Sequence, residues 1–138
     1  CGGQGAGENH DGCDAIQTNM TNSRSTDPEI FEEEYPIILA EMSLVGKKQN
    51  NGKWKGGRGL KKIFVICDNM NCSLLSNNRK EPPFGLSGGE PGKRGSNAII
   101  RNNVLKELEG NCQMQLFIGD KLTVITPSGG GYGEKNNL

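Results

Sequence analysis

Two glycine-rich stretches in the last third of the chain decide its fold. They are Phe84-Gly85-Leu86-Ser87-Gly88-Gly89-Glu90-Pro91-Gly92 and Thr126-Pro127-Ser128-Gly129-Gly130-Gly131-Tyr132-Gly133. Glycine reaches positive φ without steric cost and lets another backbone or a ligand come close, so ordered glycine clusters often mark turns or sites. No helix pattern follows the second stretch, and it lacks the Gly-Lys-Ser/Thr of a phosphate-binding P-loop. We therefore interpret both stretches as structured loops, with structural glycines at Gly88, Gly89, Gly92, Gly129, Gly130, Gly131 and Gly133.

The composition predicts a single thinly cored, turn-rich domain. The chain has 138 residues, of which 21 are glycine, 33% are hydrophobic and 5% are aromatic. This length suffices for one domain with a modest core. The chain opens on Cys1 and not on a methionine, and we expect it to be a fragment or terminal subdomain. Its 16 basic and 16 acidic residues cancel, so overall charge gives no argument for nucleic acid or an anionic membrane.

Targeting and cysteine patterns favour a cytoplasmic protein. No apolar run approaches the roughly 20 residues of a membrane-spanning helix, and the N-terminus lacks the order of a signal peptide. The five cysteines are odd in number and scattered, which suits a reducing compartment better than a disulfide framework. Cys67 and Cys72 lack a second Cys or His pair, so we predict no metal site.

The element pattern predicts a mainly β fold, hairpin-rich, with glycine-rich loops and one short helix; an α+β fold stays possible. Asp27-Pro28 followed by acidic residues favours a helix that ends at Tyr35-Pro36. Apolar runs predict strands at 37–45 and 63–67, although Ala40 and Met42 leave a helix possible over the first of these. We predict three hairpins, which pair residues 63–67 with 73–75, 97–101 with 104–108 across Asn102-Asn103, and 112–118 with 121–125 across Gly119-Asp120.

Two further features suggest chemistry but have simpler explanations. His10 is the only histidine, and in a polar segment we expect it to face solvent. Seven cations with Trp54 among them fit either phosphate contacts with a stacking platform or a solvated hairpin tip. Without a recognition motif we expect no nucleic-acid binding. The cations are Lys47, Lys48, Lys53, Lys55, Arg58, Lys61 and Lys62.

Taken in order, many short motifs make this chain resemble the C-terminal part of the hydantoinase B / 5-oxoprolinase family, in its eukaryotic ATP-dependent branch. The likeness covers nearly all of residues 1–138. Each motif alone is weak, and their shared order carries the resemblance. The motifs are Gly5-Ala6, Asp11-Gly12, the block from Met20 to Glu29, Tyr35-Pro36, Gly52, Gly56-Gly57, Gly59, Gly85-Leu86, Gly88-Gly89, Pro91-Gly92, Gly95, Asn97, Gly119-Asp120 and residues 126–133.

The resemblance implies a part of a cytoplasmic, homo-oligomeric enzyme that hydrolyses 5-oxo-L-proline, a cyclic amide, to L-glutamate. ATP and Mg would be used by a partner, a hydantoinase A-like half that is absent here, and no cofactor is expected on this segment. We expect the isolated fragment to be inactive. The hydrogen-bonding side chains Thr21, Asn22, Arg24 and Thr26 are the candidate substrate-binding residues, with Arg24 suited to bidentate contact with a carboxylate or phosphate. The same residues also fit a structural role, in which they cap the helix and form hydrogen bonds within the loop before it.

Three positions depart from the family pattern. Asn19 stands where the family commonly has histidine, Arg58 where it has an acid, and Asn77-Asn78-Arg79 where it has Glu-Arg-Arg. Such changes leave a fold intact more easily than catalysis. Two other classes of function therefore stay open, a non-catalytic β-rich structural or docking module and, more weakly, a basic RNA-contacting domain.

Overall fold

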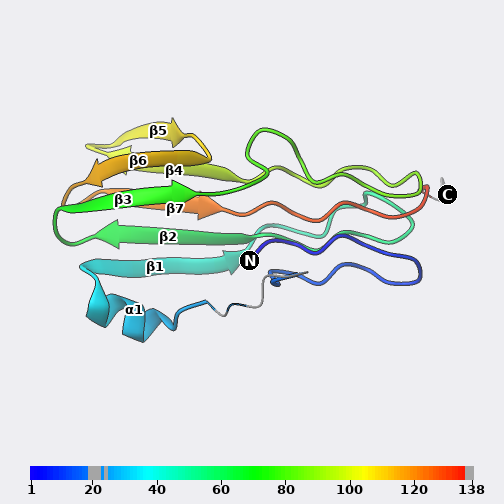
Figure 1. The fold of residues 1–138 in the computed structure, drawn as a ribbon, viewed down its shortest axis with the longest axis horizontal. Helices are drawn as coiled ribbons and strands as arrows, with labels where there is room; N and C mark the ends of the chain where they lie inside the picture. Colours follow the sequence, from blue (N-terminus) through cyan, green and yellow to red (C-terminus); the bar gives the residue numbers. More distant parts are fainter. Residues whose placement is uncertain (19–22, 24, 136–138) are drawn as a thin grey trace.

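The molecule has two unlike ends, a β-sandwich with a short helix at one and long extended segments at the other (Figure 1). The structure is a computed structural model that describes residues 1–18, 23 and 25–135. The helix and strands of this part are α1 (Pro28–Glu34), β1 (Ile37–Leu44), β2 (Leu60–Ile66), β3 (Met70–Leu75), β4 (Ser96–Arg101), β5 (Val104–Leu108), β6 (Asn111–Leu116) and β7 (Lys121–Ile125). The predicted mainly β fold with one short helix is confirmed.

The strands form two antiparallel sheets that pack face to face. The large sheet has five strands in the order β1-β2-β7-β4-β5, and a second sheet holds only β3 and β6. Ile66, Ile99, Leu116 and Leu122 form the buried core between the sheets. Ile66 and Leu116 are almost completely buried, with 1% and 2% of their surface exposed.

Of the three predicted hairpins, only β4–β5 exists. Asn102 and Asn103 connect it with φ of 51° and 62°, the left-handed geometry that asparagine tolerates best after glycine. The other two predictions were wrong. β2 pairs with β1 and β7, and β3 pairs with β6, so β6 and β7 belong to different sheets. The connections after Ile66 and Leu116 carry the chain from one sheet to the other, although each contains the residues of a hairpin turn.

The crossing from β6 to β7 is held by an ion pair whose carboxylate, that of Asp120, is buried. Asp120 has only 2% of its surface exposed, and its carboxylate accepts hydrogen bonds from Arg101 Nε and Nη2 at 3.0 and 2.6 Å and from Phe117 N at 2.8 Å. The Arg101 guanidinium also lies over the Phe117 ring, 4.5 Å from its centre. These bonds lower the pKa of Asp120, chiefly through Arg101. The turn is thereby tied to the end of β4.

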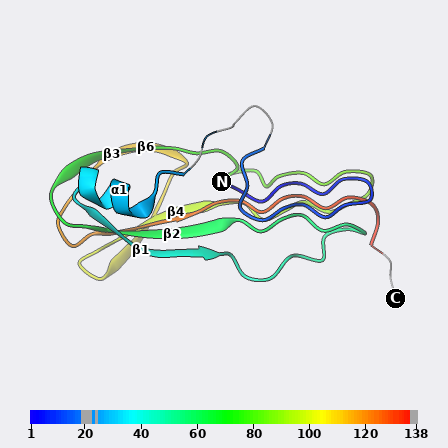
Figure 2. The same cartoon turned by 90° about the horizontal axis from the view of Figure 1, so that it is seen from below.

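The helix forms where the sequence predicts it and covers part of the large sheet. Asp27 caps α1, since its side chain accepts a hydrogen bond from Glu29 N at 3.0 Å, and Pro28 occupies the first turn. Phe31 packs on Phe64 of β2, with the ring centres 5.8 Å apart. Because Phe64 belongs to the inner face, α1 lies on the same side of the large sheet as β3 and β6, as Figure 2 shows.

The opposite, outer face of the large sheet is not covered by any described residue. Strand side chains alternate between faces, and the registers place Ile38 beside Val65 and Ile100 beside Leu105 on this side. Ile38 and Leu105 are 49% and 63% exposed. Lys121 lies in the same row of side chains. This row of the outer face is therefore mostly aliphatic, while neighbouring rows on the same face carry the charged residues Glu41, Lys61 and Glu107.

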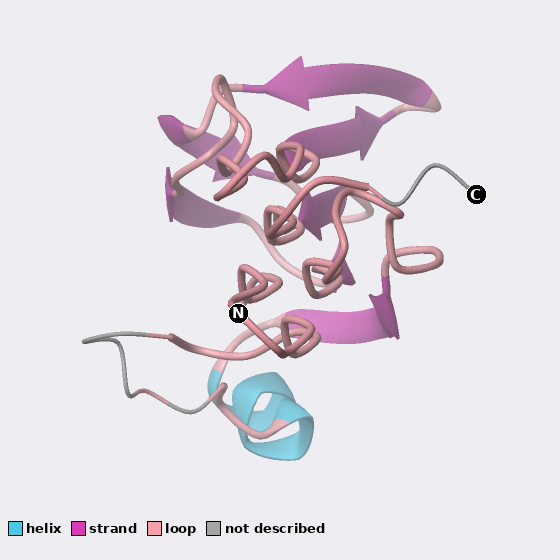
Figure 3. Cartoon of the chain, turned by 90° about the vertical axis from the view of Figure 1, so that its right-hand side faces the viewer, coloured by secondary structure: helices cyan, strands magenta, loops and turns pink. Residues whose placement is uncertain are grey.

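Beyond the sandwich, the chain forms a bundle of extended segments that belong to no sheet. Figure 3 looks along these segments and shows several of them end-on as tight coils, an appearance typical of polyproline II helices with three residues per turn. Backbone hydrogen bonds join neighbouring segments, as between Ala6 N and Gly130 O and between Gly129 N and Gly57 O, both 2.9 Å. We call this region the glycine bundle, and it comprises residues 2–7, 10–16, 51–59, 83–95 and 126–133.

Residues 129–131 run through the middle of the glycine bundle. A Cβ added at these three glycines would overlap three different carbonyl oxygens, those of Gln4, Phe84 and Asn51 respectively. Successive residues of a helix with about three residues per turn point in three directions, so each glycine faces a different neighbouring segment. The glycines are needed because no side chain fits between segments packed this closely.

Candidate functional site

The structure describes only part of the predicted substrate-binding block. Thr21, Asn22 and Arg24 lie outside the described residues, and so does Asn19. Thr26 is exposed just before α1. With Ser25 it lines a cavity of about 130 Å³ between the start of α1 and strands β1 and β2. This cavity is the place where the described end of the block meets the sandwich, and we refer to it as the α1 pocket.

A lysine that the sequence analysis did not select for this site forms the polar wall of the α1 pocket. Lys62 of β2 donates a hydrogen bond from Nζ to Ser25 Oγ at 2.8 Å. Burial lowers the pKa of Lys62 from the usual lysine value, since removal from water disfavours the charged form. Pro28, Phe31, Leu39 and Phe64 supply the apolar wall.

The α1 pocket combines one ammonium group and two hydroxyl groups with an apolar wall. An ammonium group and hydroxyl donors bind carboxylate or phosphate oxygens through charge-assisted hydrogen bonds, and the apolar wall accommodates a short carbon skeleton. The arrangement therefore suits a small acid with an apolar body. Among the described residues, no three or more His, Cys, Asp or Glu side chains gather as a metal site would require.

The strand pattern places Lys62 and Lys61 on opposite faces but does not say which of them faces the core, because Ile63 and Val65 on the face of Lys61 are as apolar as Phe64 and Ile66 on the face of Lys62. In the structure Leu60, Phe64 and Ile66 face inward, and Lys62 faces inward with them. Lys61 lies on the opposite face of β2 from Lys62, and it pairs with Glu41 at 2.9 Å.

Other cations of the basic run each make a separate contact. Lys48 donates to Gly12 O at 2.9 Å, and Lys53 lies over the Trp54 ring, 4.5 Å from its centre. Arg58 binds Asp14 through Nε and Nη2 at 2.9 and 2.7 Å, which lowers the pKa of Asp14. The basic run of the sequence therefore does not form one continuous surface.

The predicted structural glycines all lie in the glycine bundle. Gly88 and Gly133 have positive φ of 86° and 75°. Substituents at Gly89 and Gly92 would overlap backbone oxygens of the 126–133 segment, as those at Gly129, Gly130 and Gly131 overlap other segments. Carbonyl oxygens thus fill the space that a phosphate would occupy, and they repel anions. The glycine run does not fit a nucleotide.

The remaining residues selected from the sequence form no shared site in the described part, and each has its own contacts. His10 is exposed, and its Nδ1 lies 3.1 Å from Glu8 O. Arg79, which follows the departing residues Asn77 and Asn78, donates to Asn97 Oδ1 at 3.2 Å and to Asn77 O at 2.7 Å. All five cysteines are free, and burial raises the pKa of Cys72.

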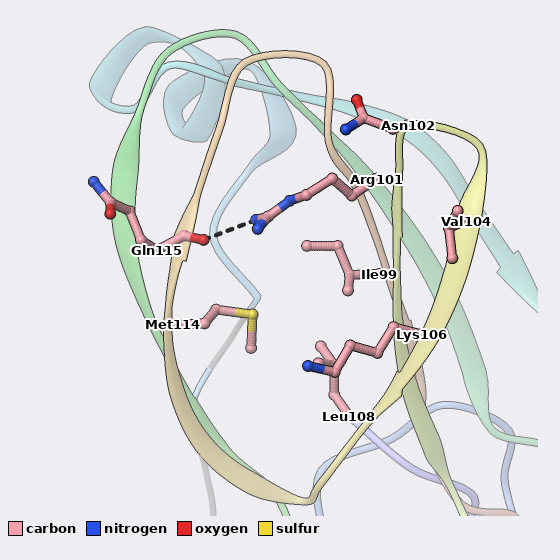
Figure 4. A pocket seen from close by; sticks show the side chains of 8 residues that line it. All are labelled: Ile99, Arg101, Asn102, Val104, Lys106, Leu108, Met114 and Gln115. Atoms are coloured by element: carbon pink, nitrogen blue, oxygen red, sulfur yellow. Dashed lines mark hydrogen bonds between the residues drawn. The ribbon is translucent and has the colours of Figure 1, made fainter.

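A second cleft, of about 340 Å³, opens at the edge of the sandwich between the β4–β5 hairpin and β6 (Figure 4). Ile99, Leu108 and Met114 give it an apolar lining. Arg101 crosses it to donate to Gln115 O at 2.9 Å. Few polar groups converge here, so the cleft offers less chemistry than the α1 pocket.

Comparison with known proteins assigns the chain to a protein family. The model of the family described as hydantoinase B/oxoprolinase matches residues 1–135. The chain belongs to this family. It is 38% identical to the 5-oxoprolinase of Dictyostelium discoideum over 99% of its length, and 40% identical to 5-oxoprolinase 1 of Arabidopsis thaliana over 96%. It spans only about a tenth of these relatives, 11% of the first and 10% of the second.

A solved structure of another protein supports the fold. The ATP-dependent caprolactamase from Pseudomonas jessenii superposes with a TM-score of 0.75 over 96% of this chain and 24% of its own, at 20% sequence identity. At this identity the likeness concerns the fold. No helix in the described part is long and apolar enough to cross a membrane.

Proposed function

We propose that this chain is part of an ATP-dependent enzyme of the cytoplasm that hydrolyses 5-oxo-L-proline to L-glutamate. The observation that supports this most strongly is the 38% and 40% identity with two 5-oxoprolinases over nearly the whole chain. In the complete, homo-oligomeric enzyme, a hydantoinase A-like half would use ATP and Mg²⁺ to activate the amide carbonyl. The isolated chain is expected to be inactive.

The α1 pocket is the part of this segment that we assign to the substrate. 5-Oxoproline is a small acid with a carboxylate on a five-membered ring. Lys62 would hold the carboxylate, Ser25 and Thr26 would donate hydrogen bonds, and Phe31 with Phe64 would contact the ring. The predicted residues Thr21, Asn22 and Arg24 precede this pocket in sequence, and their role in binding remains a prediction.

The test uses the full-length protein with ATP and 5-oxo-L-proline and measures L-glutamate and phosphate release. We expect Lys62→Gln to raise KM about tenfold, the effect of losing one charge-assisted hydrogen bond. Lys61→Gln is the matched control, because the adjacent Lys61 lies on the other face and pairs with Glu41. It should leave KM unchanged.

The possible results separate two parts of the proposal. Wild-type protein that releases no glutamate from 5-oxoproline contradicts the proposed reaction. Wild-type activity with equal KM in the Lys62→Gln and Lys61→Gln variants supports the reaction and contradicts the assignment of the α1 pocket.

The outer face of the large sheet favours a second candidate function, that of a structural module. Its exposed aliphatic residues include Ile38 and Leu105, and exposed apolar surface of this kind marks interfaces. The occupant we propose is the remainder of the longer polypeptide, since this chain matches only 11% of the Dictyostelium relative. In that case the segment positions a neighbouring domain and binds no substrate itself.

A further inference from the structure

A cavity of about 210 Å³ lies where the large sheet meets the glycine bundle. Its walls come from the turn after β1, from the 57–59 and 93–94 parts of the bundle, and from residues 125–128. Ile125 faces away from the core, because Leu122 and Val124 of the same strand face into it. The cavity therefore opens on the side of the sheet opposite the α1 pocket.

Four cations line this cavity, and none of its lining residues is acidic. They are Lys47, Arg58, Lys93 and Arg94. Within residues 1–18, 23 and 25–135, only Arg58 of these four has an acidic partner, Asp14 at 2.7 Å. Unpaired cations such as Lys80 and Lys106 also occur elsewhere in the described part, but this cavity gathers four cations with no acidic residue in its lining. Like charges that lie together without counter-charges repel one another. The cavity therefore has an excess of positive charge, and a bound anion would reduce this repulsion.

The backbone that carries these cations is held in place. Ser128 Oγ accepts a hydrogen bond from Lys93 N at 2.7 Å and donates to Gln49 Oε1 at 3.0 Å. Arg58 donates from Nη1 to Gly46 O at 3.1 Å, which fixes its guanidinium at the rim. A site whose supports are already ordered loses less entropy when a ligand binds.

We propose that this cavity, here called the junction pocket, binds the oxyanion of a small molecule, a phosphate or a carboxylate group. Lys47, Lys93 and Arg94 supply the charge, and Arg58 adds hydrogen-bond donors. Val45 and Ile125 form an apolar wall that leaves room for a short carbon skeleton. The proposal rests on the charge and shape of the junction pocket and is independent of the reaction proposed above.

The test is isothermal titration calorimetry of the full-length protein with inorganic phosphate and, separately, with acetate, at constant ionic strength set by chloride. The test variant carries Lys93→Gln and Arg94→Gln, both at exposed positions. The matched control carries Lys80→Gln and Lys106→Gln, which remove the same charge from exposed positions elsewhere. The melting temperature of each variant establishes that it is folded.

We expect a saturable anion-binding component that weakens about tenfold or more in the test variant and is unchanged in the control. Binding at the α1 pocket would be a separate component that neither variant changes, so binding that is equal in the wild type and the test variant overturns the proposal. Binding of phosphate alone assigns a phosphate ligand, and binding of acetate alone assigns a carboxylate ligand. The absence of saturable binding for both anions overturns the proposal. So does equal weakening in the two variants, because it would indicate diffuse attraction to the net charge.

Discussion

Asn51 is a buried polar residue that joins three segments of the glycine bundle. Only 3% of its surface is exposed. Its Nδ2 donates to Gly129 O and its Oδ1 accepts from Gly56 N, both at 3.1 Å, while its backbone oxygen accepts from Glu90 N at 2.6 Å. The side chain thus satisfies the hydrogen-bonding capacity of two buried backbone groups, Gly129 O and Gly56 N.

We expect Asn51→Ala to lower the free energy of unfolding by about 1–3 kcal/mol, because it leaves a buried donor and a buried acceptor unpaired. The measurement is urea denaturation. Asn50→Ala, at the exposed neighbouring position, serves as the control and should change stability by less than about 0.5 kcal/mol. Equal midpoints for the two variants would contradict the role given to Asn51.

Asp120 predicts how stability depends on pH. Its folded-state pKa lies below the usual aspartate value because of Arg101, so its contribution is complete above the unfolded-state pKa of about 3.9. The contribution is lost as pH falls through the lower, folded-state pKa. Wild-type stability should therefore decline on acidification below about pH 5, and part of that decline should be absent in Asp120→Asn.

The measurement is the melting temperature between neutral pH and the acid limit, for the wild type and Asp120→Asn. Asp14 shares the same direction of shift through Arg58, so some acid sensitivity should persist in the variant. An unchanged slope in Asp120→Asn would show that the buried carboxylate contributes nothing to acid unfolding.

The glycine bundle depends on the absence of side chains at particular positions. A Cβ at Gly129 would overlap the Gln4 carbonyl, whereas at Gly5 the nearest atom, Gly130 O, would be 3.9 Å away. Gly129→Ala should therefore destabilise the protein by about 1–3 kcal/mol or more through overpacking. Gly5→Ala, in the same bundle, should be nearly neutral. Comparison of their denaturation midpoints tests this, and equal destabilisation would mean that backbone packing is not the reason for glycine.

The sequence correctly predicted the elements whose position is determined by residues close together in the chain. The Asp27 cap with Pro28 specifies α1, and the asparagine pair specifies the β4–β5 turn. The pairing of β3 with β6 was not predictable from turns, because Gly119-Asp120 has hairpin chemistry but connects two sheets. Which sheet each strand joins depends on packing between Leu116 and the residues facing it, and those contacts are distant in sequence.

The glycine bundle was missed for a different reason. Polyproline II segments bury little apolar surface and have no internal hydrogen bonds, so they show neither helical nor strand periodicity. Residues 1–19 therefore resemble an ordinary loop in sequence. For the candidate site, the sequence pointed to the block that ends at Thr26 but not to Lys62, whose partner Ser25 lies 37 positions away in the chain.

On the proposal that this chain is part of a longer polypeptide, the neighbouring parts should affect its stability through the outer face of the large sheet. If neighbouring parts of the longer protein cover Ile38 and Leu105, the substitutions Ile38→Lys and Leu105→Lys bury a charge there. Each should then lower the melting temperature of the full-length protein by several degrees, as about 1–3 kcal/mol does in a domain of this size.

Leu75→Lys is the control for these substitutions, since Leu75 is 87% exposed at the end of β3 in the small sheet. It should change the melting temperature little. Equal, small effects of all three substitutions would show that the outer face stays in contact with water, and would remove the support for the structural-module candidate.

The extended segments at one end of the molecule also determine the circular dichroism spectrum and the hydrogen-exchange rates expected of the protein in solution. Polyproline II is a major conformation of unfolded chains, so far-ultraviolet circular dichroism will count the glycine bundle as disordered. Its amides, however, are bonded between segments, as Gly131 N is to Glu90 O at 2.9 Å. Hydrogen–deuterium exchange should therefore be slow at these amides. A spectrum suggestive of partial unfolding, together with protected glycine amides, is the solution signature expected of the native state.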